Sequence, residues 1–473
     1  MSVVYRKVSR PVASFLSFAA TLSFLAFDAG AQTSEQLAAL AVDSPDVSCL
    51  TEATLAPSVR IVACTVALES ATGTTKAAAH VQRGQAYRAT GDAARAAADF
   101  EAAIRLFDSE TDTSKLDAQY FISRATARHS VGDLARAISD YSAAIHRETA
   151  RERGDAQPAS LTVPSGSPAD REQSLARSYA NRGMARAGQK ADIQEAIADF
   201  SKSLELVPSN VDVLLLRADA YLSVSQAGAA KADAERAAAL SPENPRVHLM
   251  RGLIAARQGN VGAAFADYSE AIRLAPDYVD ALANRGALLS ASGDYDNALH
   301  DLDAALAVQP RHTIAAYNRG YVRFAQKKYA EAIADYSLAL QSQPTLAWAL
   351  ANRGLCRILD GQPAAQATAD ADEAVKLLPD NSDIRETRAF ILLKGGNSAA
   401  ALADYELALR ADAKRPVALF GRGLARQARG DAAGAKADLA AARILLPTVD
   451  REFEGLATAG AAARPAPRNP QRK

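Results

Sequence analysis

The sequence of 473 residues predicts an all-α protein, a solenoid of about ten helix–turn–helix units. A short motif recurs along the chain at intervals of about 34 residues. Within each interval, apolar residues recur three or four positions apart, the period of an amphipathic helix. Alanine is abundant and aromatic residues make up 6% of the chain, a composition that favours closely packed helices over β-sheet.

The repeat is clearest around Gly320. The segment Ala315-Ala316-Tyr317-Asn318-Arg319-Gly320 is matched at 281–286 before it and at 349–354 after it. Ten units carry an arginine followed by a small residue. From the third unit on, the small residues of consecutive units lie 34 or 35 positions apart, and the gaps after the first and second units are longer. The small residues are Gly84, Ala125, Gly183, Ala218, Gly252, Gly286, Gly320, Gly354, Ala389 and Gly423.

A turn divides each unit into two helices. In several units the turn is a Gly-Asp pair, such as 91–92, 293–294 and 430–431. Glycine can end the first helix and aspartate can cap the second. The small residues let the two helix axes approach closely, and a proline near the end of most units stops the second helix.

This pattern resembles the tetratricopeptide repeat in its period and in its small, Tyr/Phe, Ala and Pro anchors. The resemblance covers about 77–449 and implies antiparallel helix pairs stacked into a right-handed superhelix, in which each first helix lines a concave groove. The consensus tryptophan of the first helix is absent from every unit and is replaced by residues such as Leu214, Leu282 and Leu350.

The segment 1–31 has the layout of a secretory signal peptide. Arg6, Lys7 and Arg10 precede an apolar stretch over 12–27, and Ala29-Gly30-Ala31 offers a cleavage site. We expect cleavage after Ala31 and a periplasmic or secreted protein, with no membrane span in the mature chain. A leader retained as a membrane anchor is the alternative, although the apolar stretch is shorter than the roughly 20 residues that a spanning helix needs.

The rest of the chain is expected to fall into five parts. They are an N-terminal cap over 32–76, units one and two over 77–151, a flexible linker over 152–175, units three to ten over 176–449, and a C-terminal tail over 450–473 with a disordered, basic, proline-rich end. In the cap, Cys49 and Cys64 suggest a disulfide in an exported protein, with two buried free thiols as the alternative. A helix from Pro57 to Leu68, held by that bridge, would cover the open end of the array.

An arginine precedes each small residue, and each unit carries an aspartate on its second helix. The separation of the two is the same in eight units and one position longer in the two units with a longer turn. We interpret them as ion pairs that clamp helix to helix, the alternative being a basic stripe for an acidic partner. The pairs are Arg83–Asp99, Arg124–Asp140, Arg182–Asp199, Arg217–Asp233, Arg251–Asp267, Arg285–Asp301, Arg319–Asp335, Arg353–Asp370, Arg388–Asp404 and Arg422–Asp438.

The sequence contains no HExxH, CxxC, GxSxG or phosphate-binding GxxxxGK[ST] motif, and its six histidines are scattered without metal-ligand spacing. Lysine plus arginine equals aspartate plus glutamate, 54 each, so no global field attracts nucleic acid or an acidic membrane. We therefore expect no enzyme activity, no cofactor, no metal and no nucleic-acid partner.

A protein or peptide partner is the remaining expectation, through the groove that the resemblance implies. Candidate groove residues lie on two consecutive first helices, and the resemblance places the asparagines where they could bond the backbone of an extended peptide. The candidates are Tyr317, Asn318, Tyr321, Phe324, Trp348, Asn352 and Leu355. The alternative is that the aromatic residues pack against neighbouring repeats.

The predicted function is a non-catalytic scaffold or adaptor in the bacterial envelope. The alternative is a chaperone-like or regulatory subunit of an envelope assembly for secretion or polysaccharide export. The identity of the partner and the oligomeric state stay open.

Overall fold

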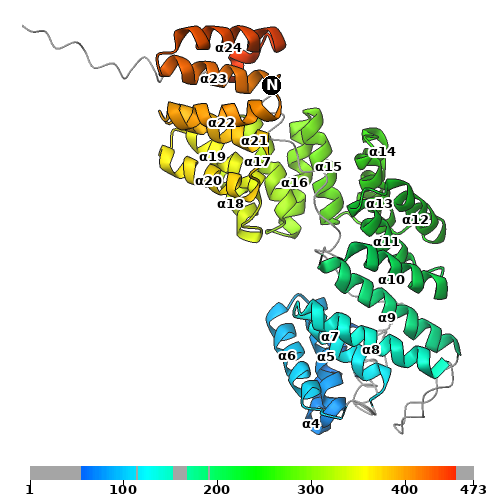
Figure 1. Ribbon diagram of the computed structural model, residues 1–473. Helices are drawn as coiled ribbons and strands as arrows, with labels where there is room; N and C mark the ends of the chain where they lie inside the picture. Colours follow the sequence, from blue (N-terminus) through cyan, green and yellow to red (C-terminus); the bar gives the residue numbers. More distant parts are fainter. Residues whose placement is uncertain (1–48, 50–54, 113–115, 153–167, 190–191, 454–473) are drawn as a thin grey trace, which may run out of the picture. The chain divides into compact units, whose positions relative to one another are not determined.

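The computed structural model describes residues 49, 55–112, 116–152, 168–189 and 192–453 (Figure 1). Across these residues every regular element is a helix, which confirms the predicted all-α class. The predicted signal peptide and residues 454–473 of the predicted tail lie outside the described residues.

The chain divides into two compact parts, which meet in sequence between Gln258 and Gly259, and we describe each by itself. The helices of the N-terminal part are α4 (Pro57–Ser70), α5 (Gly73–Ala89), α6 (Ala93–Asp108), α7 (Ala118–Ser130), α8 (Leu134–Glu152), α9 (Pro168–Gly188), α10 (Ile193–Leu206), α11 (Val211–Ser223), α12 (Ala227–Leu240) and α13 (Pro245–Arg257). The C-terminal part contains α14 (Val261–Leu274), α15 (Val279–Ser292), α16 (Tyr295–Val308), α17 (Thr313–Ala325), α18 (Tyr329–Ser342), α19 (Ala347–Leu359), α20 (Ala364–Leu377), α21 (Ser382–Lys394), α22 (Ser398–Ala411), α23 (Pro416–Ala428), α24 (Ala432–Leu445) and the short 3-10 helix η3 (Val449–Phe453).

Within each part the helices stack in chain order as antiparallel pairs (Figure 1). Repeat 1 is α5 with α6, and the numbering continues to repeat 10, α23 with α24. Several first helices also pack on the first helix of the next repeat, as α15 does on α17 and α19 on α21. This nearest-neighbour packing is that of a solenoid, as predicted.

In repeats 1 and 10, a glycine and an aspartate form the turn between the two helices. Gly91 and Gly430 take left-handed φ angles of 81° and 89°, which glycine adopts without steric cost. The side chains of Asp92 and Asp431 then accept hydrogen bonds from the backbone N–H groups of Arg95 and Gly434. These caps pair donors that would otherwise be unsatisfied at the start of α6 and α24.

The small residue of each repeat lies where its two helices touch. At Gly354 on α19, a Cβ atom would come within 2.7 Å of the carbonyl oxygen of Ala367 on α20. A backbone oxygen cannot move aside as a flexible side chain can, so this repeat requires glycine. At Gly262 on α14, by contrast, a Cβ atom would meet nothing within 4 Å.

We expect Gly354→Ala to lower the free energy of unfolding by about 1–3 kcal/mol, because the added methyl group pushes α19 away from α20. The matched control, Gly262→Ala, should cost nothing, since alanine is the better helix former. Urea denaturation followed by circular dichroism measures both. Equal midpoints for Gly354→Ala and wild type would show that the helices separate without cost.

The N-terminal cap is a helix tied down by a disulfide. Cys49 and Cys64 are bonded to each other, and both are buried in a small core with Val59, Ala63 and Ala67. The helix α4 that carries Cys64 packs on α5 and so covers the open end of repeat 1.

Two expected boundaries differ from the structure. The linker was predicted to reach residue 175, but α9 begins at Pro168. A proline is favoured at the first position of a helix, since its missing N–H is not needed there. The tail was predicted to begin at 450, but residues 449–453 form η3, in which Val449 and Phe453 are buried.

Candidate protein-interaction surface

Nine of the ten predicted Arg–Asp pairs are present as side-chain hydrogen bonds, and most are bidentate. In repeat 6 the Nε and Nη2 of Arg285 donate to the two carboxylate oxygens of Asp301 at 2.7 and 2.9 Å. Arg353 and Asp370 repeat this geometry at 2.8 and 2.7 Å. The aspartates are buried. The tenth pair, Arg251 and Asp267, has one member in each compact part.

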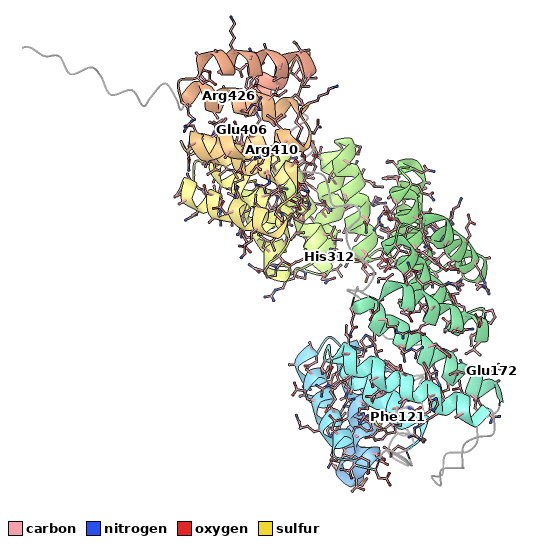
Figure 2. The ribbon with its side chains drawn as sticks, in the orientation of Figure 1. Phe121, Glu172, His312, Glu406, Arg410 and Arg426 are labelled. Atoms are coloured by element: carbon pink, nitrogen blue, oxygen red, sulfur yellow. A yellow bond between two sulfur atoms is a disulfide. The ribbon has the colours of Figure 1, made fainter. Side chains whose placement is uncertain are left out.

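Arg319 holds Asp335 differently, because its Nε and Nη2 both donate to the same oxygen, at 3.0 and 2.6 Å. The other oxygen of Asp335 accepts from a second arginine, Arg323, one helical turn later, at 2.8 Å. Second arginines of this kind contact the aspartate in five repeats, and sequence analysis missed them. They are Arg128, Arg186, Arg323, Arg357 and Arg426, the last labelled in Figure 2.

The first arginine of a repeat also reaches back to the preceding repeat. The Nη1 of Arg319 donates to Asp303 at 2.7 Å, and that of Arg353 donates to Ser337 at 3.2 Å. Both acceptors lie two positions after the aspartate of the preceding repeat. The same link is formed by Arg182, Arg217, Arg285 and Arg388. The ladder therefore joins repeats as well as the helices within one.

In repeat 1, burial and the neighbouring charges have opposite effects on the pKa of Asp99. Burial alone would raise the pKa of this carboxyl, but hydrogen bonds from Arg83 and His80 outweigh it and hold the pKa below its ordinary value. The arginine is thus matched by a carboxylate of its own. This pairing favours a structural ladder over a basic stripe for an acidic partner.

The candidate groove residues lie together on α17 and α19, but most of them are covered. Trp348 is half-buried, and the other six candidates are buried. The ring of Tyr317 packs 5.6 Å from that of Tyr336 on α18, and the ring of Phe324 packs 5.9 Å from that of Tyr329. Tyr317 and Phe324 therefore pack inside their own repeat, whereas the alternative left open by the sequence was packing against neighbouring repeats.

Asn318 is the exception among these packed side chains. It is 0% exposed, and neither its Nδ2 nor its Oδ1 has a hydrogen-bond partner in the described part of the chain. Its counterparts in the flanking repeats are better satisfied. Asn284 donates to the carbonyl oxygen of Asp280 at 2.7 Å, and Asn352 donates to the hydroxyl of Tyr317 at 3.0 Å.

An unpartnered buried amide is rare because it loses its bonds to water and gains none in return. Among the described residues, the buried Oδ1 of Asn352 also lacks a hydrogen-bond partner. The first-helix face of repeats 7 and 8 therefore carries unused donors and acceptors that the sequence alone could not reveal.

Within the described residues, no three His, Cys, Asp or Glu side chains gather in a way that could hold a metal ion. Over the same residues, no helix combines the length and the apolar character that crossing a lipid bilayer requires.

A family model for tetratricopeptide repeats matches residues 81–156, 215–279 and 284–347. Over these segments the chain consists of tetratricopeptide repeats. The matched segments lie in both compact parts and agree with the helix pairs described above. No curated protein matches the sequence.

Solved structures of tetratricopeptide-repeat proteins are similar at low identity. The APC/C hetero-tetramer Cut9–Hcn1 is 13% identical with a TM-score of 0.48, covering 90% of this chain and 96% of that one. A tetratricopeptide repeat protein from Parabacteroides merdae is 21% identical with a TM-score of 0.39, covering 52% and 98%. YrrB, described as having an unusual peptide-binding site, is 21% identical with a TM-score of 0.33, covering 41% and 97%.

Tetratricopeptide repeats form solenoids whose extended surfaces bind other proteins. Protein–protein interaction is therefore the general role that these repeats suggest.

Proposed function

We propose that this protein is a non-catalytic scaffold or adaptor of the bacterial cell envelope. It binds an extended segment of another protein on the first-helix face of α17 and α19. The amide of Asn318 on α17 is the centre of the site, which also includes Tyr321 on the same helix and Trp348 and Asn352 on α19.

The unpartnered amide of Asn318 carries this proposal. A side-chain amide offers one acceptor and two donors, and a peptide group offers the complementary N–H and C=O. A partner backbone could therefore satisfy both ends of Asn318 at once. Because Asn318 is inaccessible to solvent, the side chains that cover it must move as the partner enters.

We expect Asn318→Leu to abolish partner binding while raising the free energy of unfolding by about 1–3 kcal/mol, the cost of an unsatisfied buried polar group. Urea denaturation measures the stability. Quantitative mass spectrometry of proteins captured from an envelope extract measures the binding.

The matched control is Asn284→Leu at the same position of repeat 6. This variant breaks the bond to the Asp280 carbonyl and should lose stability, yet it should retain the captured partner. A partner lost equally from both variants, or retained by Asn318→Leu, would contradict the proposed site.

The envelope location rests on the leader-like segment that ends at Ala31 together with the Cys49–Cys64 disulfide. Disulfides persist in oxidising compartments such as the periplasm. Intact-mass analysis of protein from a periplasmic fraction should find a chain that begins at Gln32. A full-length chain confined to the membrane fraction would point to a retained anchor instead.

A further inference from the structure

The chain folds back on itself after the last repeat. Helix α24 ends at Leu445, and the C-terminal turn, residues 449–453, packs on α23 and α24. Its last residue, Phe453, is buried, with its ring 4.9 Å from that of Phe420 on α23 and 5.6 Å from that of Phe390 on α21.

The repeat register shows which surface this turn covers. Phe390 directly follows the small residue of repeat 9, and Phe420 precedes that of repeat 10 by three positions. In repeat 7 the same positions hold Tyr321 and Tyr317, two of the candidate groove residues. Phe453 therefore lies against the first helices of repeats 9 and 10, at the positions that correspond to Tyr321 and Tyr317 in repeat 7.

A second contact fixes the turn. The guanidinium of Arg443 on α24 donates to the carboxylate of Asp450, with Nη2 2.6 Å from Oδ1 and Nε 3.0 Å from Oδ2. The same guanidinium lies 5.5 Å from the ring centre of Phe420. Arg443 and Phe420 thus form one receptor for an acidic group and an aromatic ring three positions apart.

We propose that the first-helix face of α21 and α23, with Arg443, is a binding site for a protein segment of the form Asp-x-x-aromatic. The chain's own Asp450 and Phe453 occupy it. This site is separate from the one at Asn318 and does not depend on it.

The contacts of the turn suit an occupant that can be displaced. Arg443 and Asp450 are both about half exposed, and exposed ion pairs contribute little to stability. The turn is short and is held mainly by two buried side chains, Val449 and Phe453, so its local opening has to expose only these two. The contact between α23 and α24 does not run through the turn, so the turn can leave while the repeat stays folded.

The probe is a synthetic peptide of residues 447–453, acetylated, amidated and labelled with fluorescein. Its binding to full-length protein is measured by fluorescence anisotropy. Phe453→Ala in the protein should open the site and tighten peptide binding by about tenfold or more, the fold-change expected from one buried aromatic side chain. A peptide with the same substitution should not bind.

A charge swap separates recognition from a purely structural role. Asp450→Arg in the protein should expel the turn and tighten binding of the native peptide about fivefold. Arg443→Asp should instead accept a peptide carrying Asp450→Arg. The double swap in the protein should restore closure and exclude both peptides. Circular dichroism shows whether each variant remains helical.

Equal binding of the peptide by wild type and by the opened variants would overturn the proposal, and so would a lack of binding by folded Phe453→Ala and Asp450→Arg. The turn would then be a structural cap only. Asn318→Leu should leave this peptide binding unchanged, so failure here is distinguishable from failure at the Asn318 site.

Discussion

Replacing Arg285 with alanine is expected to lower the free energy of unfolding of the C-terminal part by about 3–5 kcal/mol. Asp301 is 2% exposed, and in the described residues Arg285 is the arginine that holds it. Without Arg285 a buried carboxylate is left uncompensated on α16. The link from Arg285 to Ser269 of the preceding repeat is lost as well.

Arg319→Ala is the matched comparison, because Asp335 is equally buried but keeps Arg323 at 2.8 Å. We expect this single variant to cost about 1–3 kcal/mol. Removing Arg319 and Arg323 together should then cost more than the sum of the two single losses. The second arginines thus make five rungs of the ladder tolerant of one substitution.

Urea denaturation gives the overall loss, and hydrogen exchange locates it in α15–α16 or in α17–α18. Local exchange matters because a repeat array need not unfold in one step. A double-mutant cycle on Arg285 and Asp301 isolates their coupling. A loss under about 1 kcal/mol for Arg285→Ala, as for an exposed pair, would show that the ladder does not stabilise the fold.

The ladder also shows how far sequence reasoning can reach. The pairing of Arg285 with Asp301 was predictable because a regular period reveals which residues recur together. The contact of Arg323 with Asp335 was not predictable. An arginine one helical turn after Arg319 could equally well lie on the solvent-exposed face of the helix. Whether it turns toward Asp335 depends on the packing of α17 on α18.

At the candidate site, the sequence predicted where the side chains lie along the helices better than it predicted how deeply they are buried. The repeat register places Asn318 and Asn352 on the first-helix face, and their helices have the expected bounds. The exposure of Asn318 depends instead on how the surrounding side chains pack, which the register does not fix. Phe453 was missed for a similar reason, because the polar, proline-rich composition of residues beyond it dominated the interpretation of the tail.

The second large expected effect is a loss of stability in mild acid through His129. This side chain lies near the end of α7 in repeat 2, partly buried, with its ring 6.5 Å from that of Tyr141. Burial and the nearby charge of Arg88 lower its pKa to about 4, from an ordinary value of 6.5. The folded state therefore resists protonation of an imidazole that the unfolded chain protonates readily.

The sign of the effect follows from linkage. Because the folded pKa lies below the unfolded one, the unfolded state binds more protons between pH 6.5 and pH 4. The stabilisation is complete above the unfolded pKa and is lost as the pH falls through the folded pKa. The shift corresponds to about 3 kcal/mol. Partial exposure of the ring should reduce the effect to about 2 kcal/mol.

His129→Gln should remove this acid sensitivity, so that the stability of the N-terminal part changes little between about pH 7 and about pH 4.5. The matched control is His146→Gln, which replaces an exposed histidine on α8 of the same repeat and should keep the wild-type pH profile. Urea titrations across this range, followed by hydrogen exchange in α7 and α8, measure the difference. If wild type and His129→Gln lose stability in parallel, other groups near the α7–α8 contact govern the acid response, and His129 is protonated without cost in the folded state.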